Sequence, residues 1–141
     1  MRWGDVFKSF LVFFLIFGFL SCASKEKQAE KHFRQGFTYQ DQGDLDKAID
    51  EYKKAVELNS NHLKAHMNLG AVYMRQEKYD QAIEEFSAVV KLNYYHANAH
   101  YNLGYIYILK DEKEKAQEEL KVLKMIGSGL ANRLEERMDK E

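Results

Sequence analysis

The chain has 141 residues, enough for one domain, and 45% of them are hydrophobic and 30% charged, which is typical of a folded protein and excludes a disordered one. There is no proline, and the formal net charge is -1 with basic residues interleaved among acidic ones, so we expect a largely helical protein that does not bind nucleic acid. The single cysteine, Cys22, excludes an intramolecular disulfide.

The N-terminal segment has the pattern of an export signal. Two basic residues precede an unbroken apolar run, Phe10–Leu20, which is too short to cross a bilayer core of about 30 Å as a helix. The run ends in the sequence Phe-Leu-Ser-Cys at residues 19–22, which resembles the lipobox of bacterial lipoproteins. By this resemblance residues 1–21 are a signal peptide, and Cys22 carries lipid and becomes the mature N-terminus. An attached diacylglycerol and an amide-linked acyl chain would supply the two lipid signals that stable anchoring needs.

The alternative is an ordinary signal peptide, or an uncleaved membrane anchor, with an incidental cysteine. We favour lipidation because the only cysteine of the chain lies where the apolar run stops. Ala23 and Ser24 follow it, with no aspartate of the kind that retains lipoproteins in the inner membrane. Resemblance to Gram-negative lipoproteins therefore implies a location in the bacterial cell envelope, at the outer membrane and facing the periplasm.

A unit of 34 residues then occurs three times. The same residue types return at this period, as the glycines, tyrosines and alanines show: Gly36, Gly70, Gly104; Tyr39, Tyr73, Tyr107; Ala48, Ala82, Ala116. Apolar residues at helical spacing predict two amphipathic helices in each unit. We therefore divide the mature chain into a polar tether, three repeats and a final helix: residues 22–28, 29–62, 63–96, 97–127 and 128–141.

Short polar segments separate the predicted helices. In the first repeat, Gly43 suits a left-handed helix stop and Asp44 suits the N-cap of the next helix. In the second repeat, residues 76–78 join the two helices. Asn59 and Asn93 are expected to end the second helix of their repeats, because asparagine tolerates the left-handed conformation.

The repeat resembles the tetratricopeptide repeat, whose pattern is W-x2-L-G-x2-Y, then A-x3-F, then P. The second repeat carries this pattern most fully, with histidine in place of tryptophan: His66, Leu69, Gly70, Tyr73, Ala82 and Phe86. The third repeat ends its pattern in Leu120, the first has Gln35 where leucine is expected, and no repeat has the closing proline. The resemblance implies an all-α protein, an α-solenoid of three helix-turn-helix repeats with a C-terminal capping helix.

In this family, partners bind in a concave groove built from the first helix of each repeat. The resemblance places nine residues of this chain in that groove: Phe33, Phe37, Lys64, Met67, Met74, Asn98, Tyr101, Tyr105 and Ile108. Aromatic and Met residues are enriched in protein interfaces. Members that clamp a terminal carboxylate use Lys, Asn and Arg at sites where this chain retains only Asn68, so we expect no such clamp.

Catalysis is not expected. No serine or cysteine nucleophile has a recognisable neighbourhood, and no Gly-rich loop follows a strand to hold phosphate, so we predict no enzyme and no cofactor. The histidines are the one other pattern: His62 and His66, and then His96 and His100, form pairs one helical turn apart, which are weak candidates for zinc or copper ligands. Neither pair has an obvious third ligand, so packing and helix-start roles are preferred.

The sequence thus predicts a membrane-anchored scaffold that binds an apolar or aromatic partner segment in its groove. Resemblance to small bacterial lipoproteins implies envelope assembly, such as pilus or secretion machinery or cell-wall enzymes. Two alternatives remain: a module that fills the groove with a second copy as a homodimer, and a metal-binding protein.

Replacing the predicted lipidation site tests the anchor. The change Cys22→Ser removes the only sulfur that can accept the diacylglycerol, so we expect the protein to leave the membrane fraction or to remain unprocessed. Membrane fractionation and the mass of the chain measure this outcome. A correctly sized mature form that stays on the membrane would refute the lipobox.

Overall fold

Seven helices and no strand occur in residues 23–140, the part of the chain that the computed structural model describes. The predicted signal peptide and Cys22 lie outside these residues. Residues 23–41 form an N-terminal helix, and six further helices follow: α2 (Leu45–Leu58), α3 (Leu63–Arg75), α4 (Tyr79–Leu92), α5 (Ala97–Leu109), α6 (Lys113–Met125) and α7 (Leu130–Met138). The all-α solenoid expected from the sequence is confirmed.

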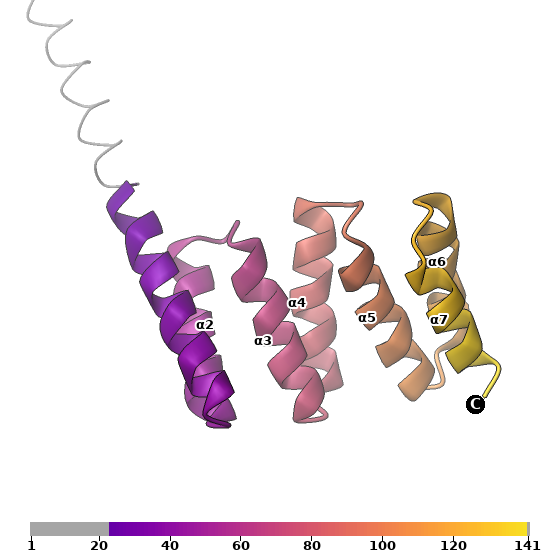
Figure 1. The fold of residues 1–141 in the computed structure, drawn as a ribbon, viewed down its shortest axis with the longest axis horizontal. Helices are drawn as coiled ribbons and strands as arrows, with labels where there is room; N and C mark the ends of the chain where they lie inside the picture. The colour runs from indigo at the N-terminus through magenta and orange to yellow at the C-terminus, as the bar shows by residue number, and fades with distance from the viewer. Residues whose placement is uncertain (1–22, 141) are drawn as a thin grey trace, which may run out of the picture.

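The helices follow one another in chain order along the long axis of the molecule, as Figure 1 shows. Packing is closest within the hairpins α3–α4 and α5–α6, and successive hairpins touch through α2–α3 and α4–α5. The last helix, α7, packs against both α5 and α6. Within the described part of the chain, no helix combines the length and the apolarity needed to cross a bilayer.

Residues 23–28, expected as a tether, are helical and continue into the N-terminal helix. Their sequence, Ala-Ser-Lys-Glu-Lys-Gln, consists mostly of residues with high helix propensity, and all six are exposed. Residues 23–28 extend the N-terminal helix without a separate nucleation cost. The helical lead-in therefore begins directly after Cys22.

The turns inside the three hairpins share one geometry. Gly43, Glu77 and Asp111, which are 34 residues apart, adopt left-handed φ values of 82°, 59° and 57°. In each turn the next residue donates its backbone N–H to a repeat tyrosine's carbonyl oxygen, as Lys78 does to Tyr73 at 2.9 Å. The expected helix stop at Gly43 is confirmed, and so is the N-cap at Asp44, whose side chain accepts from the Lys47 N–H.

Asn59 and Asn93 do end their helices, but not in the left-handed conformation. Their φ values are −141° and −147°, in the extended region. Instead, the Asn59 side-chain oxygen accepts the Asn61 N–H at 3.0 Å, and the Asn93 oxygen accepts the Tyr95 N–H at 3.1 Å. Asparagine suits these positions because its side chain forms a local turn, not because it tolerates the left-handed conformation.

Two of the repeat glycines allow an aromatic ring to approach the helix backbone. A Cβ atom on Gly36 would lie 2.7 Å from the Tyr52 ring, and one on Gly70 would lie 2.8 Å from the Phe86 ring. Both rings are fully buried. In the first two hairpins the first helix therefore rests directly on an aromatic side chain of the second.

The core is formed in two parts. The first cluster joins the first two hairpins to α5: Ala48, Ile49, Tyr52, Leu69, Val72, Tyr73, Ala82, Phe86, Leu103 and Ile106. The second joins the third hairpin to α7: Ile108, Ala116, Leu120, Leu123, Ala131 and Leu134. In the second cluster, Leu134 of α7 lies against Gly104, so α7 completes the core of the third repeat.

Adding a methyl group to one of these glycines tests the close approach. The change Gly70→Ala forces a Cβ against the buried Phe86 ring, and overpacking of this kind costs about 1–3 kcal/mol of unfolding free energy. Urea denaturation followed by circular dichroism measures it. The matched control is Gly129→Ala, since a Cβ there meets no atom within 4 Å and φ is −59°. Equal stabilities for the two variants would contradict the packing.

Candidate functional site

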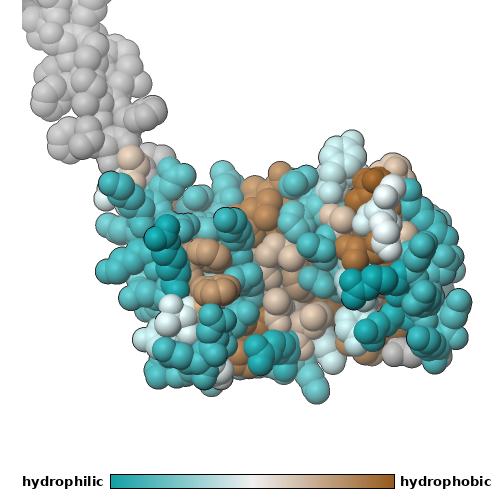
Figure 2. Space-filling view, in the orientation of Figure 1, coloured by the Kyte–Doolittle hydropathy of each residue, from teal (hydrophilic) through white to brown (hydrophobic). Residues whose placement is uncertain are grey.

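The N-terminal helix, α3, α5 and α7 form one face of the solenoid, which we call the inner face (Figure 1). Figure 2 shows apolar side chains gathered near the middle of this view, with hydrophilic side chains towards both ends. Eight of the nine groove residues expected from the sequence are at least partly accessible. The inner face is therefore the candidate site.

The nine residues differ in how open they are. Phe37, with 47% of its surface exposed, is the most accessible apolar residue of the set, and Lys64 and Asn98 are also exposed. The half-buried members are Phe33, Met67, Met74, Tyr101 and Tyr105. Ile108 is only 9% exposed and belongs to the second core cluster, so the expectation that it lines the groove is corrected. Its side chain belongs to the cluster that α5 forms with α6 and α7.

At the N-terminal end, Phe33 and Met67 belong partly to the interior. Both pack against the first core cluster. The Phe33 ring lies 5.9 Å from the Tyr52 ring and 5.0 Å from the His62 ring, centroid to centroid. These side chains form the floor of the inner face, whereas Phe37 projects from it.

Asn68, the one clamp-type residue that the chain retains, is used internally. Its amide donates to the Tyr52 hydroxyl at 3.1 Å, and that hydroxyl donates to the Gln40 side-chain oxygen at 2.8 Å. The three side chains tie α3 to the first hairpin. Asn68 is thus committed to the contact between repeats.

At the C-terminal end, aromatic and cationic groups combine. The Tyr101 and Tyr105 rings stack along α5 with centroids 6.5 Å apart and planes 11° from parallel. The guanidinium of Arg133 lies 5.1 Å from the Tyr101 centroid, and that of Arg137 lies 4.6 Å from the Tyr105 centroid. Arg137 also donates to the Tyr105 hydroxyl at 3.3 Å.

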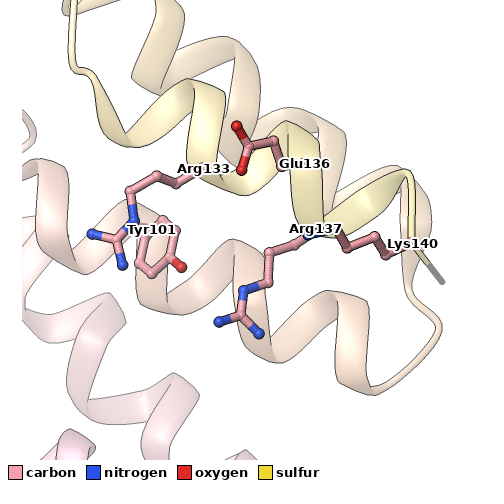
Figure 3. A pocket seen from close by; sticks show the side chains of 5 residues that line it. All are labelled: Tyr101, Arg133, Glu136, Arg137 and Lys140. Carbon is pink, nitrogen blue, oxygen red and sulfur yellow. The ribbon is translucent and has the colours of Figure 1, made fainter.

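These groups surround a cavity, shown in Figure 3, that is lined by Tyr101, Arg133, Glu136, Arg137 and Lys140. Four of its five residues come from α7 or the residues after it, a segment for which the sequence predicts only a capping role. A sequence signal did exist: Arg133 and Arg137 are four residues apart, as are Tyr101 and Tyr105, so each pair shares a helix face. The sequence does not reveal that the two arginines pack on the two tyrosines.

A second feature recurs in every repeat: a histidine of the first helix contacts a glutamate of the second. The Nδ1 atom of His32 lies 2.6 Å from Glu51, that of His66 lies 2.6 Å from Glu85, and that of His100 lies 2.5 Å from Glu119. The glutamates also recur at 34 residues, so the pairing leaves a signal in the sequence. Each pair joins the two helices of its hairpin.

Two of these histidines face acceptors on both sides. The Nε2 atom of His66 lies 3.0 Å from the Ser60 carbonyl oxygen, and that of His100 lies 2.7 Å from the Tyr94 carbonyl oxygen. A ring between a carbonyl and a carboxylate satisfies both only when both nitrogens carry protons, or when the carboxyl itself is protonated. Each ring therefore joins a backbone carbonyl of one segment to a carboxyl group of the next helix.

The pKa shifts agree with this geometry. The hydrogen bond that the protonated His66 ring donates to the Glu85 carboxylate raises the pKa of His66 above its ordinary value, against the opposing effect of burial. Burial raises the pKa of Glu119, against the opposing hydrogen bond from His100. The folded state therefore favours the protonated form of His66 in the second hairpin and the protonated form of Glu119 in the third.

The four weak metal candidates are all engaged within the fold. His62 and His96 cap α3 and α5, where their Nδ1 atoms accept the N–H groups of Ala65 at 3.3 Å and Ala99 at 3.2 Å. His66 and His100 make the pairs described above. Among residues 23–140, no three side chains of the metal-binding types converge.

Comparison with known proteins identifies the repeats. A family model described as TPR repeat matches residues 36–77, and another described as tetratricopeptide repeat matches residues 69–126. The chain therefore carries tetratricopeptide repeats. No curated protein sequence matches it significantly.

Solved structures share the fold. YrrB, described as a TPR protein with an unusual peptide-binding site, is 28% identical, with a TM-score of 0.70 over 77% of this chain and 57% of that chain. The first TPR of Spaghetti (RPAP3), solved with the HSP90 peptide SRMEEVD, is 22% identical, with a TM-score of 0.72 over 82% and 94%. The Yersinia enterocolitica secretion chaperone SycD, solved with a peptide of the translocator YopD, is 16% identical, with a TM-score of 0.71 over 79% and 89%.

The protonated His66 pair predicts a pH-dependent stability. Because the folded-state pKa is raised above the unfolded value of about 6.5, the pair stabilises the fold fully below that pH. The contribution is lost as the pH rises through the folded-state pKa. The loss of unfolding free energy caused by His66→Gln should therefore be larger at about pH 6 than at about pH 8.5.

Urea denaturation at the two pH values measures this difference. The matched variant Glu85→Gln keeps a hydrogen-bond acceptor beside the ring but removes the charge, so it should abolish most of the same pH dependence. An effect of His66→Gln that is equal at both pH values would contradict the protonated pair.

Proposed function

We propose that the chain is a protein-interaction module, not an enzyme, that binds a peptide segment of a partner protein on its inner face. The observation that carries the proposal is the accessible apolar surface there, with Phe37 exposed above the half-buried Phe33, Met67 and Met74. Aromatic residues and Met are enriched in protein interfaces relative to the rest of the surface. YrrB, of similar sequence and fold, is described as having a peptide-binding site, which supports the same class of function.

The partner segment is apolar or aromatic at this end of the face. A helix presenting apolar residues or an extended strand would both suit a surface formed by parallel rows of side chains. Such a segment buries Phe37 and leaves the interior unchanged. The module acts by holding its partner, with no chemical step.

The setting that we propose is the bacterial envelope. The apolar run Phe10–Leu20 and the cysteine that follows it support attachment to the outer membrane through lipid on Cys22, facing the periplasm. Lipid would fix the location, and the inner face would recruit a component of pilus, secretion or cell-wall machinery.

Selection from a random peptide library on the full chain in neutral detergent micelles tests the binding function. The selected peptides should be enriched in aromatic and apolar residues, and Phe37→Ser should weaken their binding roughly tenfold or more, as measured by fluorescence anisotropy. The change should leave the helical circular dichroism intact, since Phe37 lies outside both core clusters.

The matched control is Tyr95→Ser, which removes a 71% exposed aromatic side chain from the turn between α4 and α5. Undiminished binding by Phe37→Ser would refute the inner face as the peptide site. A stable dimer in sedimentation that dissociates with Phe37→Ser would mean that the face binds a second copy of this chain.

A further inference from the structure

We propose that the cavity between α5 and α7 binds a carboxylate side chain, so that the partner segment carries aspartate or glutamate next to its apolar residues. This proposal rests on the proposed function in assigning the carboxylate to a bound peptide. It adds a second, chemically different subsite to the inner face, at the opposite end from Phe37.

Charge is the first argument. The cavity is lined by Arg133, Arg137 and Lys140, with Glu136 as its one acidic lining residue. Ion pairs occupy many other cations of the described chain, such as Lys47 with Asp44 and Lys124 with Glu135. Within residues 23–140, no acidic side chain lies within ion-pair distance of the three cavity cations. A partner carboxylate would supply the missing negative charge.

The second argument is the way in which the tyrosines hold the two guanidinium groups. Each lies over a ring of α5, at 5.1 Å and 4.6 Å from the centroids. A guanidinium has five N–H donors at its edge, and the one side-chain hydrogen bond made by this pair in the described chain goes from Arg137 to Tyr105. Most donors therefore remain available for an acceptor.

Stacking also reduces the cost of binding. A guanidinium placed on a ring has already lost much of its rotational freedom, and its planar edge matches the two oxygens of a carboxylate. Figure 3 shows both Arg side chains extending from α7 towards α5, with the Tyr101 ring beside Arg133. The planar N–H edges of the two guanidinium groups are therefore positioned before a ligand binds.

The third argument is continuity with the apolar surface. Tyr101 and Tyr105 lie on α5, in the same row of first helices as Phe37 and Met67. A peptide that lies along the inner face and covers Phe37 can thus reach the cavity with a later residue. The cavity holds about 370 Å³, which accommodates a side-chain carboxylate.

The experiment uses the best peptide selected by the full chain, and its amide twin with asparagine for aspartate and glutamine for glutamate. We expect the selected peptides to be enriched in acidic residues. The double variant Arg133→Gln and Arg137→Gln should weaken the acidic peptide at least roughly tenfold and leave its amide twin unchanged. Added salt should weaken the acidic peptide alone.

Three control variants isolate the site. Lys91→Gln and Lys121→Gln each remove one exposed charge outside the cavity lining and should leave both peptides unaffected. Arg133→Lys keeps the charge but loses the planar fork, so it should recover only part of the affinity lost by Arg133→Gln. Circular dichroism checks that each variant is folded.

The outcomes separate this proposal from the proposed function. Selected peptides that lack acidic residues, or an acidic peptide that binds the Arg double variant as well as the wild type, would overturn the carboxylate site and leave the apolar site standing. An acidic preference that depends on the two arginines but persists in Phe37→Ser would support the carboxylate site and refute the apolar one.

Anionic lipid is the rival source of negative charge. We expect the wild-type full chain and its Arg133→Gln, Arg137→Gln double variant to bind phosphatidylglycerol vesicles equally well. Loss of vesicle binding in that variant, with the peptide affinities unchanged, would overturn the proposal in favour of a lipid headgroup.

Discussion

The close approach of the two helices in a hairpin is the constraint on which the other features depend. A glycine at position 70 lets the Phe86 ring lie where a Cβ would stand in any other residue. At this separation, His66 on α3 reaches Glu85 on α4 at 2.6 Å. Wider spacing would leave a partly buried imidazole and carboxylate unpaired, which costs about 1–3 kcal/mol for each group. The glycine and the histidine pair are therefore coupled parts of one repeat.

In the third hairpin the repeat glycine packs against a residue of α7 and not against an aromatic ring of its own hairpin. Leu120 stands where the earlier repeats have Tyr52 and Phe86, and it leaves space beside Gly104 that Leu134 of α7 fills. Leu134 thus fixes the rotation of α7. Because Arg133 directly precedes Leu134, and Arg137 lies one turn further on, both arginines are carried to the edge of the tyrosine stack. The cationic cavity is a consequence of how the core is closed.

The repeat period was sufficient to predict the fold and most turns. The glycine at position 43 predicted the first helix stop. As expected, α3 ends before residues 76–78 and α4 begins after them. Features that depend on two different helices were less accessible. The pairing of His66 with Glu85 spans 19 residues and does not follow from the periodicity of either helix.

The helix α7 lies outside the repeat, so no register related its residues to those of α5. For this reason the repeat pattern alone assigned Ile108 to the groove, and it did not predict that Arg133 packs on Tyr101. The predicted lipid on Cys22 and the domain limits based on the repeat remain predictions.

The two ends of the inner face differ in chemistry, and this difference gives it a direction. Phe37 and its apolar floor lie towards the N-terminus, while Arg133 and Arg137 lie on the last helix, at the other end of the long axis in Figure 1. A partner with an apolar segment followed by acidic residues satisfies both ends in one orientation. The reversed orientation would place carboxylates against Phe37 and apolar groups against two guanidinium groups, and both changes carry desolvation penalties.

Attachment through Cys22 would relate this direction to the membrane. The N-terminal helix begins at residue 23, so the apolar end of the face would be the end nearer a lipid on Cys22. The acidic part of a partner would then bind at the end away from the anchor. In this arrangement the module would orient its partner relative to the membrane as well as retain it, because the two subsites are fixed on one solenoid whose successive helices pack against each other.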